Sequence, residues 1–220
     1  MREAFHEQLD GISGQLVAMT RQVGGMIHLA TEALLSQDIH LADQAVAADA
    51  DVDRAQLDVD EQIIELVATQ APVAGELREV LSALRITANL ERMGDLAAHV
   101  AKVVRMRYPD SAVPDELRTT FAAMGAAAEQ MAAKAGEVIR TRDLATADQL
   151  ARDDDEMDRL HRSMFLVVLD HDWPRPAETA VDLALLGRYY ERFADHAVLI
   201  AGHIRYLVTG VMETPSEPQL

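Results

Sequence analysis

Residues 5–30 read FHEQLDGISGQLVAMTRQVGGMIHLA, and this stretch carries the repeat that decides the fold. Its apolar side chains recur at alternating steps of four and three residues, at Phe5, Leu9, Ile12, Leu16, Met19, Val23, Met26 and Ala30. Such spacing puts every member on one face of an α-helix, as in a helix that packs along its whole length against other helices. The sequence therefore predicts one long amphipathic helix here.

The same periodicity continues through the chain between clear interruptions. A second helix is expected after Ser36 and Asp38, residue types that cap helix N-termini, and it should end before Pro72. Further helices are expected over residues 76–107, 114–141, 143–170 and 176–209. Period-two segments typical of strands are missing, and aromatic residues make up only 4% of the chain. We predict an all-α protein of six helices of about 30 residues, each about 45 Å long.

The two halves of the chain resemble each other in register. A shift of 105 residues superimposes Asp38 on Asp143 and Asp53-Arg54 on Asp158-Arg159, and a shift of 100 superimposes Glu91-Arg92 on Glu191-Arg192. Collinear matches of charged residues across three helices indicate a duplication. We predict a single domain built from two tandem three-helix bundles, residues 1–110 and 111–212, with a flexible tail over 213–220.

Composition excludes several classes of protein and ligand. The 220 residues contain no cysteine, which rules out disulfides, thiolate metal sites and thiol catalysis. A formal net charge of −17 argues against nucleic acid or anionic lipid as the main ligand. The opening MREAFHEQLD lacks the apolar core of a signal peptide, and no run approaches the length of a membrane-spanning helix. We therefore expect a cytoplasmic protein that does not insert into membranes.

Four acidic pairs with i,i+4 spacing fall at equivalent positions of the two repeats. They are Asp49/Asp53 and Glu91/Asp95 in the first repeat, and Asp154/Asp158 and Glu191/Asp195 in the second. Each pair projects two carboxylates from one face of a helix, so two such helices packed together would bring four carboxylates to one place. Like charges at that spacing need a cation or a proton between them. Oxygen ligands suit Mg²⁺, Mn²⁺, Ca²⁺ or iron, and Zn²⁺ less specifically.

The position of these pairs on their helices strengthens the case for a site. Glu91, Asp95 and His99 continue the apolar stripe of Leu77, Leu81, Leu84 and Ala88, and Glu191 and Asp195 continue that of Ala177, Val181 and Ala184. Carboxylates in an apolar stripe require compensation by metal ions or by arginine. Arg85, Arg92 and Arg192 are candidates for an ionic network, and the residues alone leave metal binding and such a network equally open.

Other catalytic or ligating patterns are weak. His99 lies one turn from Asp95, but we interpret it as a hydrogen-bonded core histidine, and Met19, Met26, Met124 and Met131 as core residues. A ferritin-like di-iron site needs two Glu-x-x-His motifs, and only Glu3-x-x-His6 fits that motif here. The sequence shows no phosphate loop, nucleophile elbow or nucleotide-binding glycine pattern. We therefore expect no enzyme activity.

At these motifs the chain resembles the PhoU family, accessory regulators of bacterial phosphate uptake. The resemblance covers nearly the whole chain and rests on four segments: Leu84-Arg85-Ile86-Thr87, Asn89-Leu90-Glu91-Arg92-Met93-Gly94-Asp95, Tyr190-Glu191-Arg192-Phe193-Ala194-Asp195-His196 and Tyr206-Leu207-Val208-Thr209-Gly210. The chain departs from the family pattern at Tyr189, His99 and Leu199, where asparagine is common.

The resemblance implies a fold, a cofactor and a role. It implies two pseudo-twofold-related three-helix bundles with multinuclear metal clusters (Fe, Zn, Mn or Mg) bound by Asp49, Asp53, Glu91, Asp95, Asp154, Asp158, Glu191 and Asp195. It also implies a signalling adaptor that links the phosphate ABC transporter ATPase to the sensor histidine kinase of the phosphate regulon. Such an adaptor represses phosphate uptake and regulon expression when phosphate is plentiful. We further expect a homodimer. The alternatives are a metal-dependent enzyme, such as a phosphohydrolase or di-iron oxidase, and a metal-free helical scaffold.

Overall fold

The computed structural model describes residues 2–211, with side chains from Phe5 onward, and confirms the all-α prediction. The helices are α1 (Arg2–Ser36), α2 (Ile39–Gln70), α3 (Gly75–Arg107), η1 (Asp115–Leu117), α4 (Arg118–Thr141), α5 (Leu144–Val168) and α6 (Ala177–Thr209). No strand occurs within these residues. The tail expected over 213–220 lies outside the described residues.

Repeated capping residues set equivalent helix starts in the two halves. The side chain of Asp38 accepts hydrogen bonds from the backbone N–H groups of His40 and Leu41, which begins α2. Asp143 does the same for Ala145 and Thr146 at the start of α5. Because each carboxylate satisfies N–H groups that have no partner inside the helix, these two aspartates fix where the second helix of each unit begins.

Two helices are shorter than expected. The sequence predicted about 30 residues for each helix, but α4 has 24 and α5 has 25. Residues 115–117 form a separate 3₁₀ turn before α4, and α5 ends at Val168, ahead of the loop that contains Trp173 and two prolines. A proline lacks the N–H that helix continuation requires, and this loop therefore has to leave the helical path.

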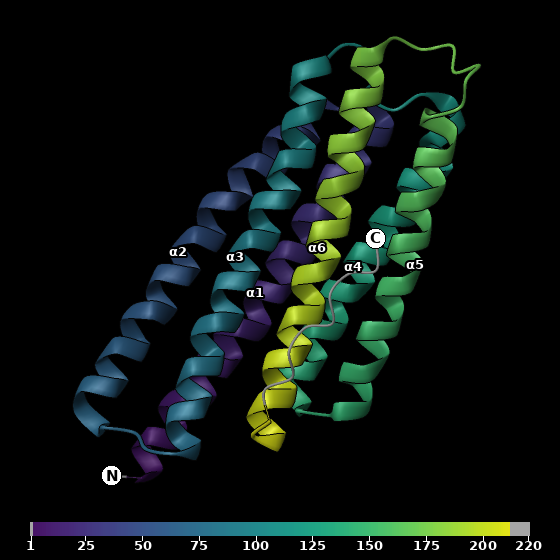
Figure 1. Ribbon diagram of the computed structural model, residues 1–220. Coiled ribbons are helices and arrows are strands. Elements are labelled where there is room, and N and C mark those ends of the chain that lie inside the picture. The colour runs from purple at the N-terminus through teal and green to yellow at the C-terminus, as the bar shows by residue number, and fades with distance from the viewer. Residues whose placement is uncertain (1, 212–220) are drawn as a thin grey trace.

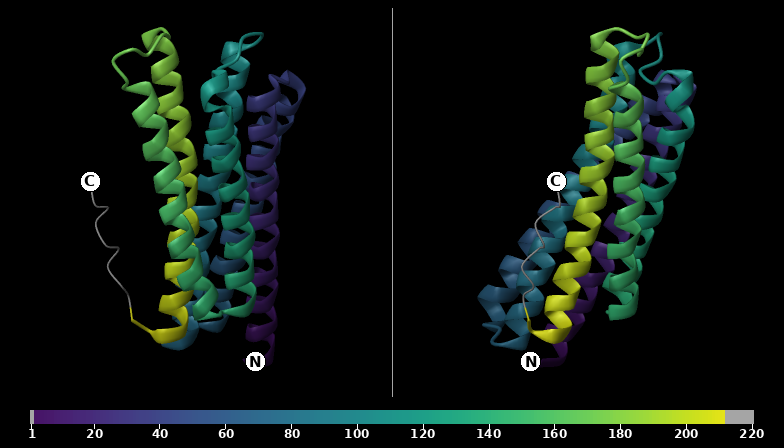
Figure 2. Two further views of the ribbon diagram at one scale, coloured as in Figure 1. Left: turned by 90° about the vertical axis from the view of Figure 1, so that its right-hand side faces the viewer. Right: turned by 45° about the vertical axis from the view of Figure 1, so that its right-hand side comes forward.

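The six helices form two layers (Figures 1 and 2). In Figure 1, α2, α3, α6 and α5 stand side by side, and α1 and α4 lie behind them. The helices of each unit pack on one another, and the units meet where α1 packs on α4 and α3 packs on α6. The predicted seam of α1 is buried from Phe5 to Ala30, and Met19, Met26, Met124 and Met131 are core residues, as predicted. One continuous core therefore joins the two units.

The back layer depends on two threonine–glycine contacts between α1 and α4. A Cβ added at Gly125 would lie 2.4 Å from Cγ2 of Thr31, and one added at Gly136 would lie 2.4 Å from Oγ1 of Thr20. The two contacts are related by the repeat, since Thr20 and Thr31 lie 105 residues before Gly125 and Gly136. Glycine is required at both positions because the helices approach too closely for any side chain.

Thr31 has little freedom to make room for a larger residue. Its hydroxyl donates to the carbonyl oxygen of Ile27 (2.7 Å) and lies 2.8 Å from the hydroxyl of Tyr190, a fully buried residue of α6. A rotation of Thr31 would break a buried hydrogen bond, which costs about 1–3 kcal/mol. The side chain of Thr31 is therefore fixed by Ile27 of its own helix and by Tyr190 of the second unit.

We predict that Gly125→Ala lowers the free energy of unfolding by about 1–3 kcal/mol, because the added methyl group overpacks the α1–α4 contact. Urea titration followed by circular dichroism measures this change. Gly25→Ala is the matched control, since a Cβ there meets nothing within 4 Å and Gly25 is an exposed residue in the interior of α1. The control should stabilise the protein by about 0.5–1 kcal/mol; equal effects of the two substitutions would contradict the packing argument.

Candidate metal centre

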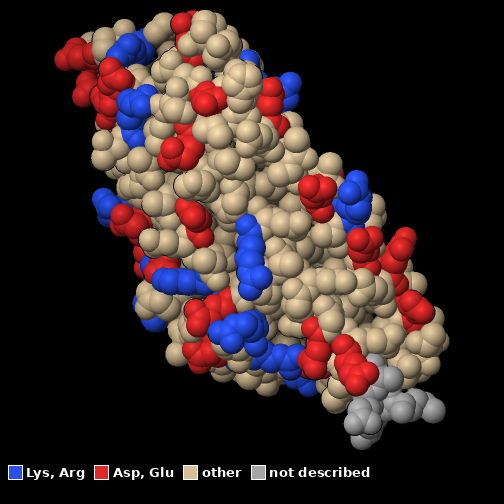
Figure 3. Space-filling view, turned by 180° about the vertical axis from the view of Figure 1, so that it is seen from behind, with Lys and Arg blue, Asp and Glu red and all other residues tan. Residues whose placement is uncertain are grey.

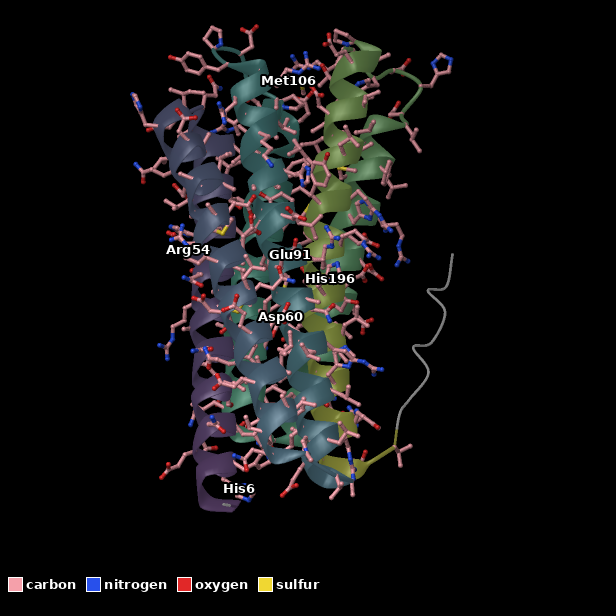
Figure 4. The ribbon with its side chains drawn as sticks, turned by 90° about the vertical axis from the view of Figure 1, so that its left-hand side faces the viewer. His6, Arg54, Asp60, Glu91, Met106 and His196 are labelled. Atoms are coloured by element: carbon pink, nitrogen blue, oxygen red, sulfur yellow. The ribbon has the colours of Figure 1, made fainter. Side chains whose placement is uncertain are left out.

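The structure brings the eight predicted carboxylates together in two groups of four. Asp49 and Asp53 of α2 face Glu91 and Asp95 of α3, near mid-height of the molecule, where Figure 4 labels Glu91. The corresponding group of the second unit lies between α5 and α6 and consists of Asp154, Asp158, Glu191 and Asp195. Within each group the carboxylates act on one another electrostatically across the helix pair.

A glycine allows the two helices of the first group to come close. Gly94 lies between Glu91 and Asp95 on α3, and a Cβ built there would be 3.2 Å from Cγ1 of Val52 and 3.4 Å from Oδ1 of Asp49. The equivalent position of the second unit is Ala194, which is fully buried. A small residue at this point therefore sets how near the facing carboxylates lie.

The carboxylates lie at the edge of the buried surface. The apolar stripes that the sequence predicted around them do not form part of the core. Leu81 and Val181, members of these stripes, are 41% and 58% exposed. The buried face of α3 instead runs through Ile86, Leu90 and Met93, beside the predicted stripe. The side chains of Glu91 and Glu191 nevertheless keep only 20% and 15% of their exposure, because the neighbouring helix covers them. The predicted apolar stripe is therefore wrong, and the role of these carboxylates as a site stays a prediction.

Burial and mutual repulsion raise the pKa of carboxyl groups in the first group. Burial is the main cause for Asp49, and the charges of Asp95 and Asp53 raise its pKa further. Burial also raises the pKa of Glu91, with a smaller contribution from Asp95, while Arg92 opposes the shift. Both causes disfavour the charged forms, so Asp49 and Glu91 bind protons more readily than exposed carboxylates do.

The second group shows the same effect more strongly. Burial, together with the charges of Asp195 and Asp158, raises the pKa of Asp154 to about 7. Burial also raises the pKa values of Glu191 and Asp195. The Oδ1 atom of Asp154 is buried and has no hydrogen-bond partner. This carboxylate oxygen can carry negative charge but accepts no hydrogen bond, and a bound cation would supply the missing partner.

Arginines compensate only half of each group. Arg92 donates to Oδ2 of Asp95 at 2.8 Å, and Arg192 lies 3.3 Å from Asp195. Glu191 pairs with Arg188, three residues earlier, a partner that sequence reasoning missed although the i,i+3 spacing pointed to it. Among the described side chains no ion pair involves the α2 and α5 members, which are Asp49, Asp53, Asp154 and Asp158.

These residues fit a metal site in their chemistry, but they do not form one in the present side-chain arrangement. Within the described part of the chain no three histidine, aspartate or glutamate side chains are positioned to hold a metal ion. The α3 and α6 carboxylates point to their arginines, so metal binding would require them to turn toward the α2 and α5 aspartates. The unpartnered oxygen of Asp154 and the four facing carboxylates in each unit are what favours a hard cation there.

The histidines near these groups take other roles. His99 is exposed and stacks on Tyr189 at 5.3 Å between ring centroids, so the interpretation as a core histidine is wrong. His99 lies one turn beyond Asp95, and there the side chain meets Tyr189 of α6 and not the core. His196, also in that seam, contacts Oδ1 of Asn89 through Nδ1 at 2.8 Å, and burial lowers its pKa to about 4. A neutral imidazole therefore joins the two units.

Comparison with known proteins agrees with the repeat. The model of the PhoU domain matches the chain twice, over residues 16–104 and 121–204. The chain belongs to the PhoU domain family. The starts of the two matched segments differ by 105 residues and their ends by 100, the two shifts found by comparing the sequence with itself. Each PhoU domain match thus covers one three-helix unit.

Curated PhoU relatives match over nearly their whole length. "Phosphate-specific transport system accessory protein PhoU homolog 2" of Mycobacterium tuberculosis is 42% identical over 96% of this chain and 99% of the relative. Homolog 1 of the same species is 41% identical over 99% of this chain and 98% of the relative. The homologue from Rhizobium meliloti is 28% identical over 98% and 92%.

Solved PhoU structures share the arrangement of helices. The crystal structure of PhoU from Pseudomonas aeruginosa superimposes with a TM-score of 0.84 at 25% identity, covering 94% of this chain and 100% of that one. The regulatory protein PhoU of Streptococcus pneumoniae gives 0.85 at 22% identity, covering 96% and 99%. The second likeness concerns the fold alone. Within residues 2–211 no helix has the length and apolarity needed to cross a membrane.

We predict that Asp154→Asn stabilises the metal-free protein at alkaline pH. An ordinary aspartate loses its proton near pH 3.8, whereas folded Asp154 loses it near 7, so the folded state binds the extra proton between these values. The free energy of unfolding therefore falls as pH rises through this window, and the asparagine variant escapes that loss.

Urea titrations in EDTA at pH 5 and pH 8 measure the effect, and the gain from Asp154→Asn should be larger at pH 8. Asp49→Asn, at the equivalent and more exposed position, is the matched control and should show a smaller gain. A gain that is the same at both pH values would mean that the titration of Asp154 does not govern it.

Proposed function

We propose that this protein is a cytoplasmic regulator of phosphate homeostasis. It couples the phosphate ABC transporter, through its ATPase, to the sensor histidine kinase of the phosphate regulon, and it represses uptake when phosphate is plentiful. The single observation that carries the proposal is the double PhoU domain match over residues 16–104 and 121–204. Relatives 42% identical over 96% of the chain carry the name of accessory proteins of phosphate-specific transport, which supports it.

The two carboxylate groups are the proposed metal-binding sites of this regulator. Asp49, Asp53, Glu91 and Asp95 would hold metal in the first unit, and Asp154, Asp158, Glu191 and Asp195 in the second. Bound cations would neutralise the repulsion within each group and provide Lewis-acidic positions for oxygen ligands. The chain itself supplies facing carboxylates at fixed helix positions, with Gly94 and Ala194 setting the distance between the helices.

The positions of the carboxylates support an adaptor. Both carboxylate groups lie along helix pairs, and none of their residues lines a cavity of about 40 Å³ between α1, α3, α4 and α6 or a more open one of about 330 Å³ at Ser111, Asp115 and Arg175. The smaller cavity is lined mainly by apolar residues such as Leu9, Ile12 and Ile204. A long helical surface with two proposed metal-binding sites offers large areas for protein contacts.

Deleting the gene should derepress the phosphate regulon in high phosphate. The reporter is a regulon promoter fused to a fluorescent protein, measured in the native host in a strain that also lacks any second PhoU-domain gene. That precaution is needed because M. tuberculosis carries both a homolog 1 and a homolog 2. Complementation with this gene should restore repression. Reporter expression that stays at the high-phosphate level after deletion would refute the regulatory role.

Removing the α3 and α6 carboxylates should abolish metal binding. We predict that protein purified without chelators contains metal, and that the variant Glu91→Ala/Asp95→Ala/Glu191→Ala/Asp195→Ala contains at least tenfold less by elemental analysis, with unchanged helicity. The matched control replaces four exposed acids outside both groups, Glu7, Glu32, Glu61 and Glu65, and should keep its metal. Equal metal content in the two variants would leave the arginine network as the role of these carboxylates.

A further inference from the structure

Helix α2 forms one edge of the molecule and has an outer face that no other helix covers. Within the described residues α2 packs mainly on α1 and α3, and Figure 1 shows it at the left of the front layer. Three large apolar residues are exposed on this face: Leu57 at 62%, Ile64 at 67% and Val67 at 40%. They are spaced by seven and three residues, so they form a stripe on one side of the helix, about 15 Å long.

Acidic residues lie beside this stripe and within it. Residues 39–70 contain eight aspartates and glutamates and a single basic residue, Arg54. By helical position Glu61, Glu65 and Asp58 lie on one side of the stripe, and Asp60 lies within its width, between Ile64 and Val67. Among the described residues, ion pairs on α2 join Asp43 to Arg105 and Asp51 to Arg54, and none involves the four acids beside the stripe.

The figures show the same concentration of charge. In Figure 3, seen from behind, acidic side chains gather along the right-hand edge of the molecule, which α2 forms. Figure 4 faces that edge, with Arg54 and Asp60 labelled on it. The acids therefore remain available to a partner on a surface that also exposes apolar side chains.

The equivalent helix of the second unit shows that the fold does not require this face. With the shift of 105, Leu57 corresponds to Arg162, Asp58 to Ser163, Glu61 to Leu166 and Ile64 to Leu169. Helix α5 has six acids and three arginines, and ion pairs use Asp148, Asp153 and Glu156. Two helices with the same place in the fold thus differ in the chemistry of their outer faces.

We propose that the outer face of α2 binds a basic amphipathic helix of a partner protein. The acidic stripe face is defined by Leu57, Asp58, Asp60, Glu61, Ile64, Glu65 and Val67. An apolar stripe flanked by acids complements a helix whose apolar face is flanked by lysine or arginine. A second copy of this face, an anionic lipid surface and nucleic acid would all be repelled by the same acids. The inference deepens the proposed function, on which it rests for the identity of the partner protein.

The direct test uses a fluorescent 18-residue amphipathic leucine/lysine peptide as probe, with binding to the full chain followed by anisotropy. Leu57→Ser/Ile64→Ser should weaken binding at least tenfold, and both residues are exposed enough for the protein to fold unchanged. Glu61→Gln/Glu65→Gln should weaken binding and reduce its dependence on salt. The same peptide with glutamate in place of lysine should not bind.

Glu7→Gln/Glu32→Gln is the matched control, because it changes net charge by the same amount at exposed positions of α1. It should bind the peptide like the unmodified chain. A loss as large as that of Glu61→Gln/Glu65→Gln would overturn the proposal, because attraction by overall charge would then explain binding. Sedimentation of the chain with phosphatidylglycerol vesicles would overturn it in favour of a membrane surface.

A second measurement separates this inference from the proposed function. The deletion strain is complemented with Leu57→Ser/Ile64→Ser and scored with the regulon reporter in high phosphate, where repression should be lost. If the unmodified gene represses and this variant represses equally, the acidic stripe face is not the contact and the regulatory role stands. If deletion leaves the reporter unchanged while the peptide still distinguishes the variants, the regulatory role fails and the binding face stands.

Discussion

The close approach of α1 and α4 is the constraint on which the rest of the structure depends. Gly125 and Gly136 have no side chains because Thr31 and Thr20 occupy that space. The contact is made twice, at positions that the repeat relates, and both times α1 supplies the threonine and α4 the glycine. These two contacts hold the two units together in a pseudo-twofold arrangement. Thr31 also lies within hydrogen-bond distance of Tyr190 of α6, which ties the back layer to the front layer.

This rigid frame explains how the molecule keeps carboxylates together. Four like charges between a pair of helices repel one another, and isolated helices would separate to relieve that repulsion. Here α2 and α3 are both held by α1, and α5 and α6 are both held by α4. Burial, together with this repulsion, raises the pKa values of Asp49, Glu91, Asp154 and Glu191. Packing energy in the back layer therefore maintains an electrostatic arrangement in the front layer.

Duplication supplied two equivalent units, and the differences between them are informative. The second carboxylate group is more buried than the first, which is why Asp154 shows the stronger pKa shift. Among the described residues, Asp58, Asp60, Glu61 and Glu65 of α2 form no ion pair and lie near exposed apolar residues, whereas α5 carries three arginines and pairs three of its six acids. The repeat explains why the two units share a core and equivalent carboxylate groups. Their outer surfaces differ, so the two units can bind different partners.

Most of the fold followed from local rules. The seam of Phe5 to Ala30 specified a packed helix, Asp38 and Asp143 specified helix starts, and the shifts of 105 and 100 residues specified two units. The shortened α4 and α5 were missed, since periodicity does not register a 3₁₀ turn. The Arg188–Glu191 pair was missed too, although its spacing is visible in the sequence.

The sequence by itself determined the helical class, the duplication and the eight acidic positions, because each of these is a matter of spacing along one chain. Only the tertiary structure decided which face of α3 is buried, that Leu81 and Val181 are exposed and that His99 lies outside the core. Periodicity marks a helix face but not the neighbour that covers it. That depends on where the Thr–Gly contacts place α1 against α4, and hence α3 against α6.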